Sequence, residues 1–215
     1  IRPADPRIRH LRGEVLYRLD RWEEAAEELA AALRLDPEGP RAHEAAFDHG
    51  VALTRLERFD EAAAAYERFL EESPWPTARA IALTNLAETL MAADRLDEAV
   101  ARYRVAIATQ PRYTHAFLGL AVALDRQGDE GGAAEAMVTA MATGAGFEEL
   151  DNPAVFFVPD WEHHYYRALA HEALDEEIEA RVHWQAFLDE GGSTGPFATR
   201  AREHLAALAS RDGDL

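Results

Sequence analysis

Apolar residues recur every three or four positions through most of the chain, which places them on one face of a helix. Acidic clusters, glycines and prolines separate these stretches and mark turns between them. The stretches have similar lengths and come in pairs. The pattern predicts five pairs of helices, at residues 6–19 and 22–35, 41–56 and 59–72, 76–93 and 96–109, 112–127 and 130–143, and 160–174 and 176–190.

The pairs are copies of one repeat. An acidic turn followed by an alanine recurs along the chain, and these alanines are Ala25, Ala62, Ala99, Ala133 and, in a weaker copy, Ala180. They are separated by 37, 37, 34 and 47 residues, close to the period of about 34 residues that is typical of one class of helical repeat.

Small and large residues keep the same phase in every copy. Twelve positions before each alanine is another small residue: Gly13, Gly50, Ala87, Ala121 and Ala168. Four positions after it is a larger one: Leu29, Tyr66, Tyr103, Met137 and Trp184. Small side chains let two antiparallel helices approach closely where they cross. Prolines end three of the second helices, because proline has no amide to continue the hydrogen-bond ladder: Pro37, Pro74 and Pro111.

This combination of small, large and proline positions resembles the tetratricopeptide repeat, and the segment from Ala116 to Asp129 matches it best. The resemblance implies an all-α fold, a right-handed superhelical α-solenoid that forms a single domain over residues 1–215. We expect repeats at about 6–37, 41–74, 78–111, 112–145 and 160–190. A helix at 196–210, with an apolar face on one side only, is expected to cap the last pair.

The long interval before the last repeat predicts a non-repeat insertion at residues 143–160. This stretch is rich in glycine and contains two prolines, which break the helical phase. It also contains an apolar run that includes Phe156 and Phe157. The favoured interpretation is that this run packs onto the array; the alternative is a docking loop that exposes both phenylalanines to a partner.

Composition narrows the functional classes. The chain has no cysteine, which excludes disulfides, thiolate metal sites and a cysteine nucleophile. The net charge of −18 disfavours nucleic acid and favours a basic partner. All 22 basic residues are arginine, which indicates coding bias in a GC-rich, bacterial genome. No apolar run is long enough to predict a transmembrane segment. The compartment stays open, with the cytoplasm favoured, because Ile1 is not a methionine and a leader or upstream domain can have been removed.

The first helix of each pair lines the concave surface of stacked repeats, so its outward residues are the expected partner-binding positions. These positions carry aromatic groups and carboxylates rather than the lysines with which some family members clamp chaperone C-termini, so that role is rejected. The mixture predicts a basic or amphipathic peptide lying across repeats one to four. The expected partner-binding residues are His10, Glu14, Tyr17, Glu44, Phe47, Val51, Arg55, Asn85, Glu88, Met91 and Asp125.

Catalytic and metal sites are the weaker alternatives. His164 and His171 lie seven positions apart on one helix face, with His183 nearby in sequence, and neutral imidazoles can bind zinc. Histidines at such positions are more often packing residues with a polar edge, so we predict no metal, no cofactor and no catalytic residues. The sequence therefore predicts a non-enzymatic adaptor or scaffold that binds a protein or peptide. The alternative is a self-assembling structural subunit of a larger, multiprotein complex.

Overall fold

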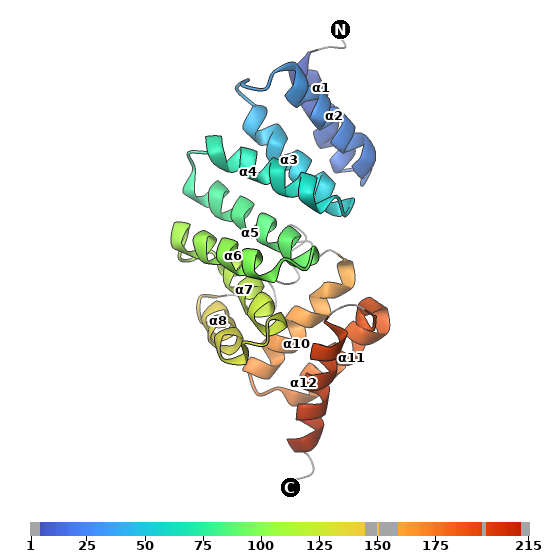
Figure 1. Cartoon of the computed structure of the whole chain (residues 1–215), viewed down its shortest axis with the longest axis vertical. Coiled ribbons are helices and arrows are strands. Elements are labelled where there is room, and N and C mark those ends of the chain that lie inside the picture. Colours follow the sequence, from blue (N-terminus) through green and yellow to red (C-terminus); the bar gives the residue numbers. More distant parts are fainter. Residues whose placement is uncertain (1–4, 145–149, 151–158, 195–196, 212–215) are drawn as a thin grey trace. The chain divides into compact units, whose positions relative to one another are not determined.

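The computed structural model describes residues 5–144, 150, 159–194 and 197–211, and these residues form helices and turns with no β-strand (Figure 1). They divide into two compact units, residues 1–111 and 112–215. The all-α fold of paired helices predicted from the sequence is confirmed. The expectation of a single continuous domain stays a prediction.

Unit 1 contains three antiparallel helix pairs stacked in sequence order (Figure 1). Each pair packs internally, and α2 and α4 also pack on the first helix of the following pair. The pairs are α1 (Pro6–Tyr17) with α2 (Trp22–Leu35), α3 (Ala42–Arg55) with α4 (Phe59–Glu72), and α5 (Pro76–Ala92) with α6 (Leu96–Thr109).

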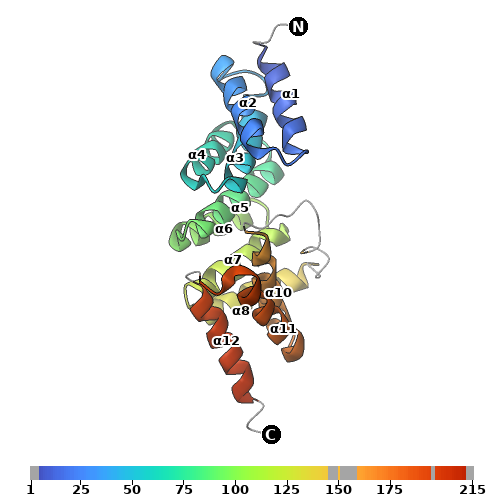
Figure 2. The same ribbon diagram turned by 90° about the vertical axis from the view of Figure 1, so that its right-hand side faces the viewer.

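Unit 2 contains two further pairs and a terminal helix. α7 (Thr114–Arg126) pairs with α8 (Glu130–Ala142), and a short 3-10 turn, η1 (Asp160–Glu162), leads into α10 (His163–Ala173). α10 pairs with α11 (Glu177–Phe187), which ends in a π-helical turn, η2 (Leu188–Gly192). α12 (Ala198–Arg211) packs against α11 (Figure 2).

The small-to-large pairing predicted from the sequence is present at the helix crossings. A Cβ atom added at Gly13 would lie 2.6 Å from Cγ of Leu29, and one at Gly50 would lie 2.8 Å from Cε1 of Tyr66. In the other three pairs an alanine takes the small position, and both partners are buried: Ala87 with Tyr103, Ala121 with Met137, and Ala168 with Trp184. The large side chain of each second helix therefore fills the space that the small residue leaves.

Three second helices end just before the prolines that the sequence predicts to stop them. α2, α4 and α6 each end two residues before Pro37, Pro74 and Pro111. The intervening residues have ψ angles of 77°, 118° and 89°, outside the α region: Asp36, Ser73 and Gln110. The proline ring clashes with a helical conformation at the residue before it, which accounts for these ends.

The turns inside the pairs share one backbone feature. The residue five positions before each repeat alanine has a left-handed conformation, with φ between 55° and 85°: Asp20, Glu57, Asp94, Gly128 and Asp175. Only the fourth is glycine, and L-residues with a Cβ atom pay a steric cost in this region. The amide of the next residue donates a hydrogen bond to the carbonyl five positions earlier in every one of these turns, which is the backbone closure of a Schellman helix end.

Candidate functional site: an apolar groove with a carboxylate rim in unit 1

A groove of about 330 Å³ opens along unit 1, and its walls come mainly from the first helices of the three pairs. Its floor is apolar, with Phe47 from α3, Phe69 from α4, and Ala78 and Ile81 from α5. Phe47 packs on the ring of Phe69 with the ring centroids 5.3 Å apart, which fixes the shape of the floor.

Charged side chains surround this floor. Glu14 projects from α1, and Glu44 and Asp48 project from α3 one turn apart. One cation, Arg41, also lines the groove; its Nε lies 2.6 Å from Glu44 and its guanidinium 3.6 Å from Glu14. Three carboxylates against one guanidinium leave the rim negatively charged, as the overall acidity of the chain would favour.

Three of the predicted partner-binding residues line this groove: Glu14, Glu44 and Phe47. Four others are buried, with no more than 3% of each residue exposed, so a peptide lying in the groove does not contact them: His10, Val51, Met91 and Asp125. Helical phase alone placed these four outward, but neighbouring helices cover them. Phe156 and Phe157 of the possible docking loop lie outside the described residues.

The remaining four predicted residues are half-buried and have contacts within unit 1. Arg55 lies over the Trp22 ring at 5.5 Å, and Tyr17 packs edge-on against the same ring at 5.2 Å. Burial, followed by the nearby Asp48 carboxylate, raises the pKa of Tyr17. Glu88 accepts a 2.8 Å hydrogen bond from the hydroxyl of Tyr103, and Asn85 contacts the hydroxyl of Tyr66. These side chains hold the repeats together.

Sequence reasoning missed five residues of the groove: Arg41, Asp48, Phe69, Ala78 and Ile81. Asp48 lies four positions after Glu44 and thus one turn along the same face, so helical spacing was a usable signal for it. Phe69 belongs to a second helix, α4, whereas the predicted partner-binding positions lie only on first helices. Ala78 and Ile81 depend on how far α5 is displaced from α3, which no sequence pattern reports.

Unit 2 instead brings polar groups together in its interior. Asp125 of α7 is 1% exposed and accepts hydrogen bonds from Tyr165 at 2.5 Å, Arg200 at 2.8 Å and His204 at 3.0 Å. Burial alone would raise the pKa of Asp125, but the hydrogen bonds from His204 and Arg200 outweigh it and lower that pKa. This network ties α12 to α7 and α10, and its charges are already paired.

His164, His171 and His183 of unit 2 lie against one another. The rings of His171 and His183 are parallel within 9°, with centroids 5.2 Å apart, and the Nδ1 atoms of His164 and His183 lie 3.0 Å from each other. Burial and the neighbouring His164 lower the pKa of His183 to about 4, and burial also lowers that of His164. The three rings thus pack on one another, and Nδ1 of His171 lies 2.7 Å from Glu176.

No helix within the described ranges is both long enough and apolar enough to cross a membrane.

The chain is similar to a known protein family in sequence and to solved structures in fold. A family model described as "Tetratricopeptide repeat" matches residues 4–74 and 84–144. No curated protein sequence matches the chain significantly. Among solved structures, MamA superposes with a TM-score of 0.58 at 19% identity, covering 84% of this chain and 95% of MamA.

Two further solved structures are similar over nearly the whole chain. PilW, described as a widely conserved type IV pilus biogenesis factor, has a TM-score of 0.62 at 21% identity, covering 92% of this chain and 83% of PilW. YrrB, described as a protein of this repeat class with an unusual peptide-binding site, has a TM-score of 0.56 at 15% identity, covering 94% of both chains. At these identities the similarity concerns the fold.

Proposed function

Because the chain belongs to the tetratricopeptide repeat family, we propose that it is a non-catalytic adaptor that holds a partner protein in the groove of unit 1. The family and the structural neighbours support a role as a protein-interaction scaffold. The groove supports a finer statement: the partner presents a basic, amphipathic segment. The observation that carries this proposal is an apolar floor bordered by three carboxylates.

The two parts of the groove make different contributions to binding. The floor of Phe47, Phe69 and Ile81 takes apolar side chains, and burying their surface contributes about 25 cal/mol per Å² before the costs of association. The carboxylates of Glu14, Glu44 and Asp48 attract arginine or lysine, which raises the association rate and sets the orientation. A segment with apolar residues on one face and basic residues on its edges satisfies both.

Fluorescence anisotropy with a labelled, twelve-residue amphipathic peptide rich in leucine and arginine tests this proposal. The full chain is titrated in buffer with EDTA at low and moderate salt. We expect that Glu14→Gln, Glu44→Gln and Asp48→Asn together weaken binding at least tenfold and flatten its salt dependence, and that Ile81→Ala weakens it without changing the salt dependence.

A matched control removes the same number of charges elsewhere in unit 1. Glu24, Glu61 and Glu98 are exposed carboxylates of the second helices, each paired with an arginine three positions earlier. Changing all three to glutamine alters the net charge equally but leaves the groove intact. Equal loss of binding in the control and groove variants would show that only the overall charge matters and would refute the groove as the site.

Self-assembly is a second candidate function, favoured by an apolar stripe on α1. Leu11 and Val15 lie one turn apart on one face of α1, Leu19 follows in the turn after the helix, and the three residues are 48%, 55% and 60% exposed. The residue 37 positions after Val15 is Ala52 of α3, which is fully buried in a helix that packs on α2. The α1 stripe thus has the character of a stacking face. Light scattering over a concentration series tests this. The mass of the wild-type chain should rise with concentration, and that of the Val15→Glu variant should stay at the value of a monomer.

A further inference from the structure

His10, Glu14 and Asp48 converge at the end of the groove where α1 meets α3. The Nε2 atom of His10 lies 3.0 Å from Oδ2 of Asp48 and 3.7 Å from Oε1 of Glu14. All three ligand atoms lie within 4.8 Å of one another, and no other trio of histidine, aspartate or glutamate ligand atoms within the described part of the chain does so. We propose that these three side chains bind a first-row divalent cation of the Zn²⁺ type.

The helix geometry presents the three groups together. His10 and Glu14 are four positions apart on α1 and therefore lie one above the other on the same face. Asp48 comes from α3, and its carboxylate lies close enough to α1 to raise the pKa of Tyr17, after the larger effect of burial. Helix α1 thus supplies two ligands and helix α3 supplies the third, and no ligand comes from a loop.

The distances suit coordination. Nitrogen and oxygen ligands bind zinc at about 2.0–2.2 Å, which places ligand atoms of one ion roughly 3.0–3.4 Å apart in tetrahedral or octahedral geometry. The separations of 3.0 and 3.7 Å from His10 Nε2 are within a few tenths of an ångström of that range. A small rotation of the Glu14 carboxylate, which is partly exposed, completes the approach.

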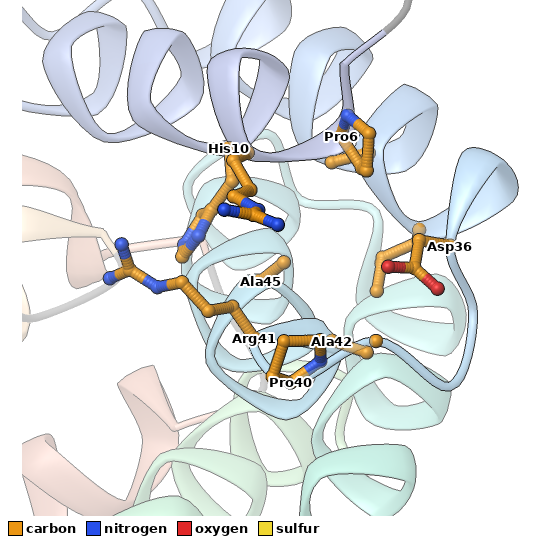
Figure 3. Close-up of a pocket in the computed structure, with 11 residues that line it drawn as sticks. Pro6, His10, Asp36, Pro40, Arg41, Ala42 and Ala45 are labelled. Atoms are coloured by element: carbon orange, nitrogen blue, oxygen red, sulfur yellow. The ribbon is translucent and has the colours of Figure 1, made fainter.

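Nε2 of His10 donates to the Asp48 carboxylate, and a cation that binds there takes the place of this proton, so the ring must carry its proton on Nδ1 instead. The side chain is 2% exposed, and its Nδ1 atom has no hydrogen-bond partner among the described residues. A pocket of about 30 Å³ adjoins this ring, lined also by Pro6, Asp36 and Ala42 (Figure 3). That volume holds one water molecule, which would accept the Nδ1 proton and leave the Nε2 lone pair for the cation.

Arg41 is the competitor for this site. Its guanidinium lies 3.6 Å from Glu14, and Figure 3 shows it next to His10. However, the shorter contact of Arg41, 2.6 Å, is to Glu44, and its side chain is 43% exposed. A cation that binds Glu14 displaces the longer contact while Arg41 keeps its bond to Glu44.

The site also opens toward the groove, since Glu14 and Asp48 both line it. Three protein ligands leave at least one coordination position free, and that position takes water or a group from a bound partner. The inference concerns metal binding by the chain alone and does not require the proposed peptide-binding function.

Isothermal titration of the metal-free full chain with ZnCl₂ tests the inference, in a non-chelating buffer at pH 7.5 without peptide. We expect one equivalent to bind at this site, with affinity lowered at least tenfold by Asp48→Asn and by His10→Gln, and raised severalfold by Arg41→Ala. His10→Gln keeps the volume of the buried ring, and circular dichroism verifies that each variant is folded.

The control addresses adventitious binding by the histidine stack of unit 2. His164→Ala removes a ring of that stack and should leave the affinity of the proposed site unchanged. Wild-type affinity in folded His10→Gln or Asp48→Asn would overturn the proposal, as would the absence of zinc binding or its loss in His164→Ala. Because no peptide is present, failure here is distinguishable from failure of the groove experiment.

Discussion

His204 of α12 lies with its Nε2 atom 3.0 Å from Oδ1 of Asp125 at the end of α7, so that the two residues join elements 79 positions apart in the chain. The other ring nitrogen of His204 lies 3.0 Å from Glu172 of α10, and the ring stacks on Trp184 of α11 at 4.5 Å. One imidazole of α12 therefore contacts three other helices, α7, α10 and α11. The buried residues of α12 are Ala198, Ala201 and Leu208.

The first prediction concerns Asp125, whose charge is buried and paired. Asp125→Asn removes the buried carboxylate that Arg200 and His204 share, and we expect the free energy of unfolding of unit 2 to fall by about 3 kcal/mol. Glu130→Gln is the matched control, because Glu130 also bonds Arg200 but its side chain is 74% exposed. That change should cost less than about 1 kcal/mol. Urea denaturation followed by tryptophan fluorescence measures both, and equal effects would contradict the assigned role of Asp125.

The second prediction is a loss of stability in alkaline solution. Burial alone would lower the pKa of His204, but hydrogen bonds from its ring to Asp125 and Glu172 raise that pKa to about 9, above the ordinary value of 6.5. The folded state therefore holds a proton that the unfolded state releases between these values. The resulting stabilisation, about 3 kcal/mol at most, is fully present below pH 6.5 and is lost as the pH rises through about 9.

His204→Gln isolates this contribution. The variant should be less stable than the wild type at pH 6, and the difference should shrink steadily toward pH 9.5. Denaturation curves at several pH values measure the difference. A difference that does not depend on pH would mean that His204 acts by packing on Trp184 alone.

The third prediction concerns the helix crossing at Gly50. A methyl group there would lie within 2.8–3.0 Å of three atoms of the fully buried Tyr66 ring. The overpacking costs about 1–3 kcal/mol, which exceeds the gain of about 1 kcal/mol from replacing glycine by alanine in a helix. We expect Gly50→Ala to lower the stability of unit 1 on balance.

Gly131→Ala serves as the comparison for this change. Gly131 lies in the first turn of α8, is exposed, and has no atom closer than 4.0 Å to an added Cβ among the described residues. The variant should be neutral or slightly stabilising in chemical denaturation. A stabilising effect at both glycines would show that the crossing at Gly50 has room to spare.

Much of the fold could be predicted because its determinants are local and repeated. Helical phase located each helix to within a few residues, and the residue before each proline cannot be helical, so Pro37, Pro74 and Pro111 set the ends of three second helices. The spacing from Gly50 to Tyr66 predicted a helix crossing because a small and a large residue recur at that spacing in every repeat.

The candidate site was less predictable, because exposure depends on neighbours that are distant in sequence. Glu14 and Glu44 line the groove, whereas Asp125 and His10, which helical phase also placed on a surface, are buried. Asp125 is covered by α12, whose position is set by its own contacts with Asp125, Glu172 and α11. His10 faces the junction of α1 with α3, and the sequence pattern does not report how closely those two helices pack.

The left-handed residue in every turn within a pair makes these turns unsuitable for inserting foreign sequence. Those turns fix the angle between two helices, and an added residue there would rotate one helix relative to its partner. The connections after the second helices vary in length, with six residues between α2 and α3 and three between α4 and α5. A tag or reporter peptide inserted near Gly39, in the longer of these two connections, therefore leaves each hairpin intact.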